Sequence, residues 1–309
     1  MGKIDISVVI PVKNGQRYLD AVLKAVFSQK ISAGFEVIVV DSGSKDKTPD
    51  IAGNYPVGFY RIREEDFNHG LSRNYGISKA KGQYVILMTA DAIPCNDSWM
   101  EKLTANLAAD GEVAGAYSRQ VPHQDSSALT RIRTSRFFTF SAEKRESRII
   151  DRDAYSNLPF QDKHRFCNFD NVSSCIRRSV WEKMPFPRTD FAEDLEWSKS
   201  VLEAGYKIVY EPGSIVYHSH DFSPLAWHKK NMVNYRKLYS LFGPEDTGSR
   251  HSFLADFMFY TLRDCYSLCR DYRRIKTILS SITLIPAYSF AAAFAQYRSI
   301  KDYTRSITS

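Results

Sequence analysis

The sequence predicts an α/β protein built on a mostly parallel sheet, with a helical region at its C-terminal end. The first 90 residues alternate short β-rich runs with segments of helical periodicity, which is the pattern of consecutive βα units. From residue 223 onward the periodicity is helical throughout. The 309 residues are 43% apolar and 25% charged, a composition typical of a folded globular protein that excludes a disordered or fibrous chain.

Local patterns define four strands and the helices between them. Strands are predicted over residues 6–10, 35–40, 58–63 and 84–88. Helices are predicted over residues 19–27, where apolar side chains recur at steps of three and four, directly after residues 46–49, and over residues 71–80. Right-handed crossovers make these strands parallel, so their C-terminal ends share one edge of the sheet, where open α/β folds bind ligands.

The patterns after residue 90 are less regular. Helices are expected over residues 97–109 and 195–204, strands over 207–210 and 214–217, and a charged, helix-prone stretch over 127–148. In the tail, apolar residues at helical spacing form one broad face, which two cysteines prolong: Phe253, Leu254, Phe257, Met258, Tyr260, Leu262, Cys265 and Cys269. We expect both cysteines to fill the core of that region.

Charge divides the chain into a neutral body and a basic tail. Residues 223–309 carry 13 Lys and Arg against 6 Asp and Glu, which accounts for the whole net charge of +7. We therefore expect a catalytic domain over residues 1–222 and a helical region over 223–309. A basic tail behind a neutral body indicates contact with an acidic surface, whereas a nucleic-acid binder would spread its charge over the working face.

Targeting and membrane signals are weak. The five cysteines form no CxxC pair, and the apolar run at residues 6–10 is too short and too acidic in its flank for a signal peptide, so we expect a reduced, cytoplasmic protein. Residues 277–297 are 21 residues without a charge, but several serines and Pro286 interrupt them. A membrane span, a helix lying on a membrane surface and an ordinary packed helix all remain open for this segment.

Two predicted strands end in an acid at the shared edge of the sheet. Asp41 follows the second strand and Asp91 follows the fourth. A carboxylate in this place can accept hydrogen bonds from a base or a ribose, or hold a divalent cation that binds phosphates. The small residues after Asp41 suit close approach by a ligand, but GxxxxGK[ST] and GxGxxG are both absent, which argues against a P-loop and a dinucleotide site.

Further candidate groups lie late in the chain. His218 and His220 follow a predicted strand, and we expect only one of the two imidazoles to join a metal site with Asp91. With phosphate oxygens and water, such a pair would make an octahedral site for Mn or Mg. Glu193 and Asp194 come at the start of a predicted helix, where N-capping by Asp194 is a sufficient structural explanation.

These segments together resemble glycosyltransferase family 2, enzymes of the GT-A fold that use nucleotide-sugar donors. The matching segments are residues 6–14 (ISVVIPVKN), 36–48 (EVIVVDSGSKDKT), 73–74 (RN), 91 (D) and 192–196 (AEDLE). Residues 67–70 (FNHG) and 87–94 (LMTADAIP) are similar to the bacterial rhamnosyltransferases that build surface polysaccharide. The chain departs from the family at its Asp-x-Asp motif, which here is Thr89, Ala90 and Asp91.

The resemblance implies a role for each candidate residue. Pro11 and Asn14 would line the base pocket, Asp41 would bind the pyrimidine N3–H, and Ser44 and Arg73 would lie near the nucleotide. Asp194 would be the general base, and Asp91 with His218, or second His220, would bind a divalent cation, Mn or Mg. Asn171, Glu193 and Trp197 would border the sugar or the acceptor.

The implied reaction is a single displacement with inversion at the anomeric carbon. The donor would be dTDP-L-rhamnose and the acceptor a hydroxyl of a glycan or a lipid-linked saccharide. The basic tail would meet an anionic bilayer, which places the protein peripherally on the inner face of the cytoplasmic membrane. The alternatives are a sugar nucleotidyltransferase and a non-enzymatic membrane-surface or nucleic-acid-binding protein. We expect no nucleic-acid partner, and the sequence does not indicate an oligomeric state.

Overall fold

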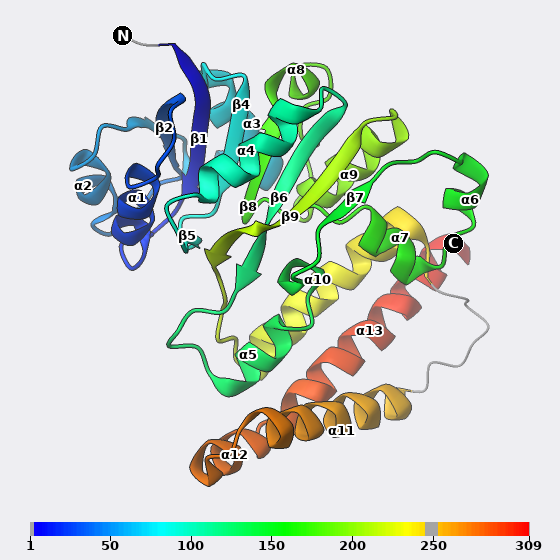
Figure 1. Ribbon diagram of the computed structural model, residues 1–309. Helices are drawn as coiled ribbons and strands as arrows, with labels where there is room; N and C mark the ends of the chain where they lie inside the picture. The colour runs from blue at the N-terminus through cyan, green and yellow to red at the C-terminus, as the bar shows by residue number, and fades with distance from the viewer. Residues whose placement is uncertain (1–2, 245–252, 309) are drawn as a thin grey trace. The chain divides into compact units, whose positions relative to one another are not determined.

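The computed structural model describes residues 3–244 and 253–308, and the chain forms two compact units (Figure 1). Unit 1 comprises Met1–Val121, Phe138–Ser156 and Phe166–His218, and unit 2 comprises Pro122–Phe137, Asn157–Arg165 and Ser219–Ser309. Two internal segments that lie before residue 222 therefore cluster with the tail. The division into domains at residue 222 stays a prediction.

Unit 1 is built on one mixed sheet with strand order β3-β2-β1-β4-β8-β6-β9-β5, to which β7 adds by pairing with β9. The strands are β1 Ile4–Val12, β2 Gly34–Asp41, β3 Gly58–Arg61, β4 Tyr84–Met88, β5 Ile93–Pro94, β6 Val113–Val121, β7 Arg145–Ser147, β8 Ser173–Arg177 and β9 Lys207–Tyr217. Strands β1 to β4 pair in parallel, as the sequence predicts, whereas β8 is antiparallel to both of its neighbours.

Helices cover both faces of the parallel half of this sheet. The helices of unit 1 include α1 Leu19–Phe27, α2 Thr48–Gly53, α3 His69–Lys79, α4 Trp99–Ala109, α8 Arg178–Trp181 and α9 Glu193–Glu203. Leu23 of α1 and Leu103 of α4 share one core with Val8 of β1. On the opposite face α3 approaches so closely that a Cβ at Gly76 would lie 2.4 Å from Val9. Because β1 is covered on both sides, it reads as a continuous apolar run.

The structure corrects two predictions about the later part of the chain. The stretch over residues 127–148 is not one helix: it contains α5 Ala128–Thr134, the 3-10 turn Phe138–Phe140 and strand β7. Pairing of β7 with β9 overrides the local helical preference there. The two strands predicted over residues 207–217 are the single strand β9, whose register against β6 shifts between Ser118 and Arg119.

Unit 2 is all-helical over the residues that the structure describes, which confirms the predicted helical extension. Its main helices are α5, α10 Pro224–Phe242, α11 Phe253–Asp271, α12 Ile275–Ile282 and α13 Ile285–Thr308. Helix α13 packs along both α10 and α11, and α5 packs against α11 and α12. A small core holds this unit together, with Leu129, Leu268 and Ile285 at its centre. Cys269 is exposed, so the expectation that it fills the core is wrong.

The uncharged segment at residues 277–297 belongs to two helices. It covers the end of α12 and the start of α13, with the break at Thr283 and Leu284 and with Pro286 in the first turn of α13, where proline is tolerated. Among the described residues no single helix has both the length and the apolar character to cross a bilayer. Only α12 and α13 taken together reach that length and apolarity, with a bend of 42° between them.

Candidate active site

The loops after β1 and β2 are joined to each other by hydrogen bonds. The Asn14 N–H donates to Ser44 Oγ at 2.8 Å, and the Lys45 N–H donates to Asn14 Oδ1 at 2.9 Å. Asn14 adopts a left-handed backbone conformation with φ of 51°, which asparagine tolerates better than most residues. Pro11, near the end of β1, pairs in register with Val40 of β2. The predicted base-pocket residues therefore gather at the C-terminal ends of these two strands.

Asp41 ends β2 with its side chain completely buried. Its Oδ1 accepts the Ser44 N–H at 3.1 Å. Within the described part of the chain its buried Oδ2 accepts no hydrogen bond, although Arg61 Nε lies 3.4 Å away. A buried acceptor without a donor is costly, so this oxygen is ready to receive an N–H from a ligand.

Asp91 and His218 face each other beyond the ends of β4 and β9. His218 Nε2 lies 3.9 Å from Asp91 Oδ1, and the two side chains belong to a group of potential metal ligands. Gln120 fixes the imidazole: its Nε2 donates to Asp170 Oδ2 at 2.7 Å, so its Oε1 faces His218 Nδ1 at 2.9 Å. The oxygen of Gln120 can only accept, which places a proton on Nδ1, so in the neutral imidazole the lone pair of Nε2 faces Asp91.

His220 lies in the last segment of unit 2, Ser219–Ser309, and its part in a metal site stays a prediction. The expectation that only one of the two histidines can join such a site has no geometric basis. Side chains two residues apart in an extended chain point to the same side, so His218 and His220 are not separated by strand alternation.

Asp194 lies in the first turn of α9, among other acids. Its Oδ2 accepts the Asn171 N–H at 3.0 Å, and its Oδ1 accepts the Leu195 N–H at 2.8 Å. Burial raises the pKa of Asp194 well above its ordinary value, and the charges of Glu193 and Asp170 raise it further. Asp194 is not the N-cap of this helix, because Ala192 occupies that position with φ of 54°. The capping explanation for this carboxylate therefore fails.

Glu193 forms a buried ion pair with Arg73 of α3. Arg73 Nη1 lies 2.9 Å from Glu193 Oε1, and the side chains are 8% and 5% exposed. Asn171 Nδ2 donates to the same carboxylate at 3.1 Å. Arg73, which was expected near the nucleotide, thus contacts Glu193, one of the two neighbouring acids at the start of α9. Asn171, which bonds both acids and is itself 1% exposed, holds them in position.

Trp197 is a core residue in this structure. It is 1% exposed, its indole N–H donates to the Met184 carbonyl at 2.7 Å, and its ring lies against Phe169 and Phe186. Its only donor and its ring are already engaged within the core. We therefore correct the expectation that Trp197 borders the sugar or the acceptor.

Gln120 and Asp170 are site residues that the sequence alone did not indicate. Their hydrogen bond joins the Asp91 and His218 group to the acids at α9, because Asp170 also acts on Asp194 through its charge. Gln120 lies in the C-terminal part of β6 and Asp170 lies just before β8. A polar residue at a strand end is the same signal that marked Asp41, but neither strand was recognised as one.

Comparison with known proteins identifies the family. The family model described as glycosyl transferase family 2 matches residues 7–176. The O-antigen chain rhamnosyltransferase RfbN of Salmonella typhimurium is 31% identical over 223 residues, which cover 71% of this chain and 68% of that protein. The O-antigen chain rhamnosyltransferase WbaN of Salmonella anatum is 32% identical over 64% of this chain and 61% of its own length.

Solved structures share the fold at low sequence identity. The mannosyltransferase PcManGT from Pyrobaculum calidifontis superposes with a TM-score of 0.55 at 16% identity, covering 100% of this chain and 76% of that one. TarS 1–349 from S. aureus does so with a TM-score of 0.52 at 14% identity, covering 98% and 92%. The chain therefore belongs to glycosyl transferase family 2, and it is a nucleotide-sugar-dependent glycosyltransferase of the GT-A fold.

Proposed function

We propose that the protein transfers L-rhamnose from dTDP-L-rhamnose, with inversion, to a hydroxyl of a glycan or lipid-linked acceptor. The arrangement of Asp194 carries this proposal, because a sugar hydroxyl needs a base as it attacks and Asp194 is a carboxylate of raised pKa in the first turn of α9. The choice of rhamnose rests on the two Salmonella relatives, both named as rhamnosyltransferases.

Asp194 is suited to proton abstraction by its surroundings. A carboxylate of ordinary pKa is a weak base at neutral pH, and a raised pKa brings it nearer to the working pH. Backbone N–H groups of Asn171 and Leu195 hold both of its oxygens, while the helix N-terminus favours its negative charge. Arg73 neutralises Glu193 beside it, so that only one of the two neighbouring acids needs to change protonation.

Asp41 and its loops are proposed to hold the pyrimidine nucleotide. The buried Oδ2 of Asp41, which accepts no hydrogen bond from the described residues, fits the N3–H of thymine or uracil, which is the one ring donor that both bases share. Asn14 and Ser44 fix the backbone of the loops around it. The TarS 1–349 structure that resembles this chain was solved in complex with UDP-GlcNAc, a pyrimidine nucleotide-sugar.

A divalent cation, Mn or Mg, is proposed at Asp91 and His218. The fit rests on the lone pair of His218 Nε2, which Gln120 directs toward Asp91. Two ligand atoms on one octahedral ion of this size lie about 3 Å apart, so the pair would have to close by about 1 Å. Similar structures were solved with Mn²⁺ in PcManGT and with Mg²⁺ in a mycobacterial glucosyl-3-phosphoglycerate synthase.

Such a cation would neutralise the charge that develops on the departing diphosphate. EDTA is therefore expected to remove most of the activity and excess Mn²⁺ or Mg²⁺ to restore it. Full activity in EDTA would indicate that arginine and lysine side chains, and not a metal ion, stabilise the leaving diphosphate.

A peripheral membrane role is proposed for unit 2. Apolar side chains at every fourth position of α11 stay exposed: Leu254 (64%), Met258 (59%), Leu262 (66%) and Tyr266 (67%). Arg270, Arg273, Arg274 and Lys276 follow at the end of this helix and the start of α12. An apolar stripe beside basic residues is typical of helices that lie on an anionic bilayer. Leu262→Asp is expected to weaken sedimentation with phosphatidylglycerol vesicles, and unchanged sedimentation would exclude this surface.

The donor is tested by turnover and product analysis. The full chain is incubated with dTDP-L-rhamnose, UDP-GlcNAc or GDP-mannose and a rhamnose-acceptor oligosaccharide, and the anomeric configuration of the product is read by NMR. We expect transfer from dTDP-L-rhamnose only, with the configuration opposite to that of the donor. Transfer from another donor would overturn the sugar assignment alone, whereas retained configuration would overturn the mechanism.

A further inference from the structure

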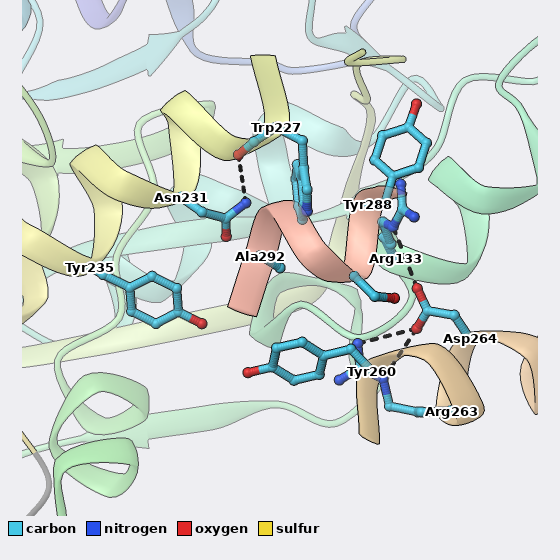
Figure 2. A pocket seen from close by; sticks show the side chains of 10 residues that line it. Arg133, Trp227, Asn231, Tyr235, Tyr260, Arg263, Asp264, Tyr288 and Ala292 are labelled. Atoms are coloured by element: carbon cyan, nitrogen blue, oxygen red, sulfur yellow. Dashed lines mark hydrogen bonds and ion pairs between the residues drawn. The ribbon is translucent and has the colours of Figure 1, made fainter. Parts of the chain in front are cut away.

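Unit 2 contains a partly open pocket of about 140 Å³ between α5, α10, α11 and α13 (Figure 2). Arg133 comes from α5, Trp227 and Asn231 from α10, Arg263 from α11 and Ser289 from α13. A dry engineered cavity of about 150 Å³ accommodates a benzene ring. The space therefore suits a compact group such as a phosphate rather than a whole sugar nucleotide.

Three guanidinium groups converge on one carboxylate at the wall of this cavity. Asp264 is 4% exposed, with Arg133 Nε 3.7 Å from its Oδ2 and Arg263 Nη2 3.2 Å from its Oδ1. Arg136 pairs with the same Oδ1. Figure 2 shows the side chains of Arg133 and Arg263 directed at Asp264.

This cluster carries more positive than negative charge. One carboxylate balances one of the three cations, and buried charges without a counter-ion are costly. Asp256 is a further acid near the cavity, where it acts on Tyr260 and Tyr235, and Asp271 acts on Arg136, which does not line the cavity. At the cavity wall itself, Arg133 and Arg263 face the single carboxylate of Asp264.

Polar atoms with unused bonding capacity line the same space. In the described part of the chain, the buried Nη2 of Arg133 and the buried Oγ of Ser289 have no hydrogen-bond partner. Arg133 is 12% exposed and stacks on Tyr288 at 3.9 Å, which leaves little solvent access to its guanidinium group. Burial also lowers the pKa of Arg133, and a nearby anion would offset that destabilisation of the charged form.

We propose that this cavity binds a phosphate-class oxyanion, with Arg133 and Ser289 as its principal ligands. The Tyr260 hydroxyl donates to Gln296 Oε1 at 2.8 Å on one side of the space, and the Asn231 amide donates within its own helix. The oxyanion could come from a soluble phosphate or diphosphate, or from the headgroup of a phosphorylated lipid. The site lies wholly in unit 2 and does not depend on the proposed donor, base or cation.

Isothermal titration of the full chain with inorganic pyrophosphate and with phosphate, in EDTA to suppress metal-dependent binding, tests this site. We expect Arg133→Gln to lower the affinity at least tenfold. Asn231→Asp, which places a carboxylate on the cavity wall, should do the same if Arg133→Gln fails to fold. Arg298→Gln removes the same charge from an exposed position on α13 and is expected to leave the affinity unchanged.

A second arm distinguishes the sources of the oxyanion. Sedimentation with phosphatidylcholine vesicles, with and without phosphatidic acid, uses the same variants. If Arg133→Gln or Asn231→Asp weakens binding to phosphatidic acid vesicles, Arg298→Gln does not, and binding of pyrophosphate and phosphate is unaffected, the ligand is a lipid headgroup. If the variants affect neither pyrophosphate, phosphate nor phosphatidic acid binding, or if Arg298→Gln weakens binding as much as Arg133→Gln does, the site is overturned. No sugar transfer is measured, so a wrong donor or base would not alter this result.

Discussion

The two halves of the sheet in unit 1 hold their polar groups in different ways. In the parallel half, Asp41 keeps one buried oxygen that accepts no hydrogen bond from the described residues. In the half that contains β6, β8 and β9, the acids Asp170, Glu193 and Asp194 are tied to neighbouring side chains or backbone N–H groups. We propose that the first arrangement receives a ligand and that the second orients the groups that act on it.

This difference predicts a separation of kinetic effects. Variants in the parallel half should change donor binding and hence KM, because they remove contacts made equally in the ground state and the transition state. Variants at the start of α9 should change kcat, because a base acts only as the reaction proceeds. Each substitution below therefore tests whether recognition and chemistry lie in separate halves of the sheet.

The largest effect is expected for Asp194→Asn. The amide keeps the shape of the side chain and can still accept the Asn171 N–H, but it leaves the Leu195 N–H unmatched and cannot take a proton. General bases typically contribute about 10²–10⁴-fold, so kcat should fall by that factor with the donor KM nearly unchanged. Steady-state kinetics with dTDP-L-rhamnose measures both constants.

Glu203→Gln is the matched control for Asp194→Asn, because it removes a carboxylate from the exposed end of the same helix. Its kcat should equal that of the wild type. In thermal unfolding, Asp194→Asn should gain stability relative to the wild type as the pH rises. The reason is that a carboxylate whose pKa is raised by folding loses stability as pH rises through that pKa. A kcat near the wild-type value in Asp194→Asn would show that Asp194 of α9 is not the general base.

A smaller effect, on KM, is expected for Asp41→Asn. The carboxylate offers one oxygen to the Ser44 N–H and the other to the ligand, whereas an amide has a single oxygen and must leave one donor unmatched. An unmatched buried donor costs about 1–3 kcal/mol, so the donor KM should rise roughly 10- to 100-fold with kcat little changed. A lower kcat at an unchanged KM would contradict the separation of the two halves.

The smallest effect is expected for Gln120→Ala. This substitution removes the group that fixes the His218 ring without touching a proposed ligand atom. Loss of such a partner typically costs about 10–100-fold in metal affinity, so the concentration of Mn²⁺ for half-maximal activity should rise by about that factor. Saturating Mn²⁺ should restore most of the wild-type rate. If the metal requirement is unchanged, Gln120 does not orient His218.

The parallel half of the sheet was predictable because its signals are local. Strands β1, β2 and β4 are covered on both faces and therefore read as apolar runs, and Asp41 and Asp91 directly follow such runs. The helices of the tail were also predictable from their apolar periodicity, although the break between α12 and α13 was not. A strand or helix whose pattern extends over five or more consecutive residues can be predicted without knowing which elements it packs against.

The other half was predictable only in part: β9 was expected as two strands, whereas β6 and β8 were not recognised. These strands carry serines that are buried by bonding one another: Ser118 Oγ lies 2.7 Å from Ser173 Oγ and 2.8 Å from Ser214 Oγ. Buried serines interrupt the apolar pattern that marks a strand. The ion pair of Arg73 and Glu193 joins α3 to α9, and no local feature of either segment indicates it.

Trp197 shows the opposite error. The resemblance to glycosyltransferase family 2 implied that Trp197 borders the sugar or the acceptor, but its ring lies against Phe169 and Phe186. Whether a large aromatic side chain packs inward or faces a ligand depends on the three-dimensional surroundings, which proximity in sequence does not reveal.

The pH dependence of kcat, compared between the wild type and Asp194→Asn, tests the central claim most directly. The base must be ionised to act, so the wild-type rate should fall as pH decreases through the raised pKa of Asp194, well above the ordinary carboxyl range. The residual activity of Asp194→Asn should lack this acidic limb. An acidic limb that persists unchanged in the variant would show that another group accepts the proton, and would contradict the assignment of Asp194.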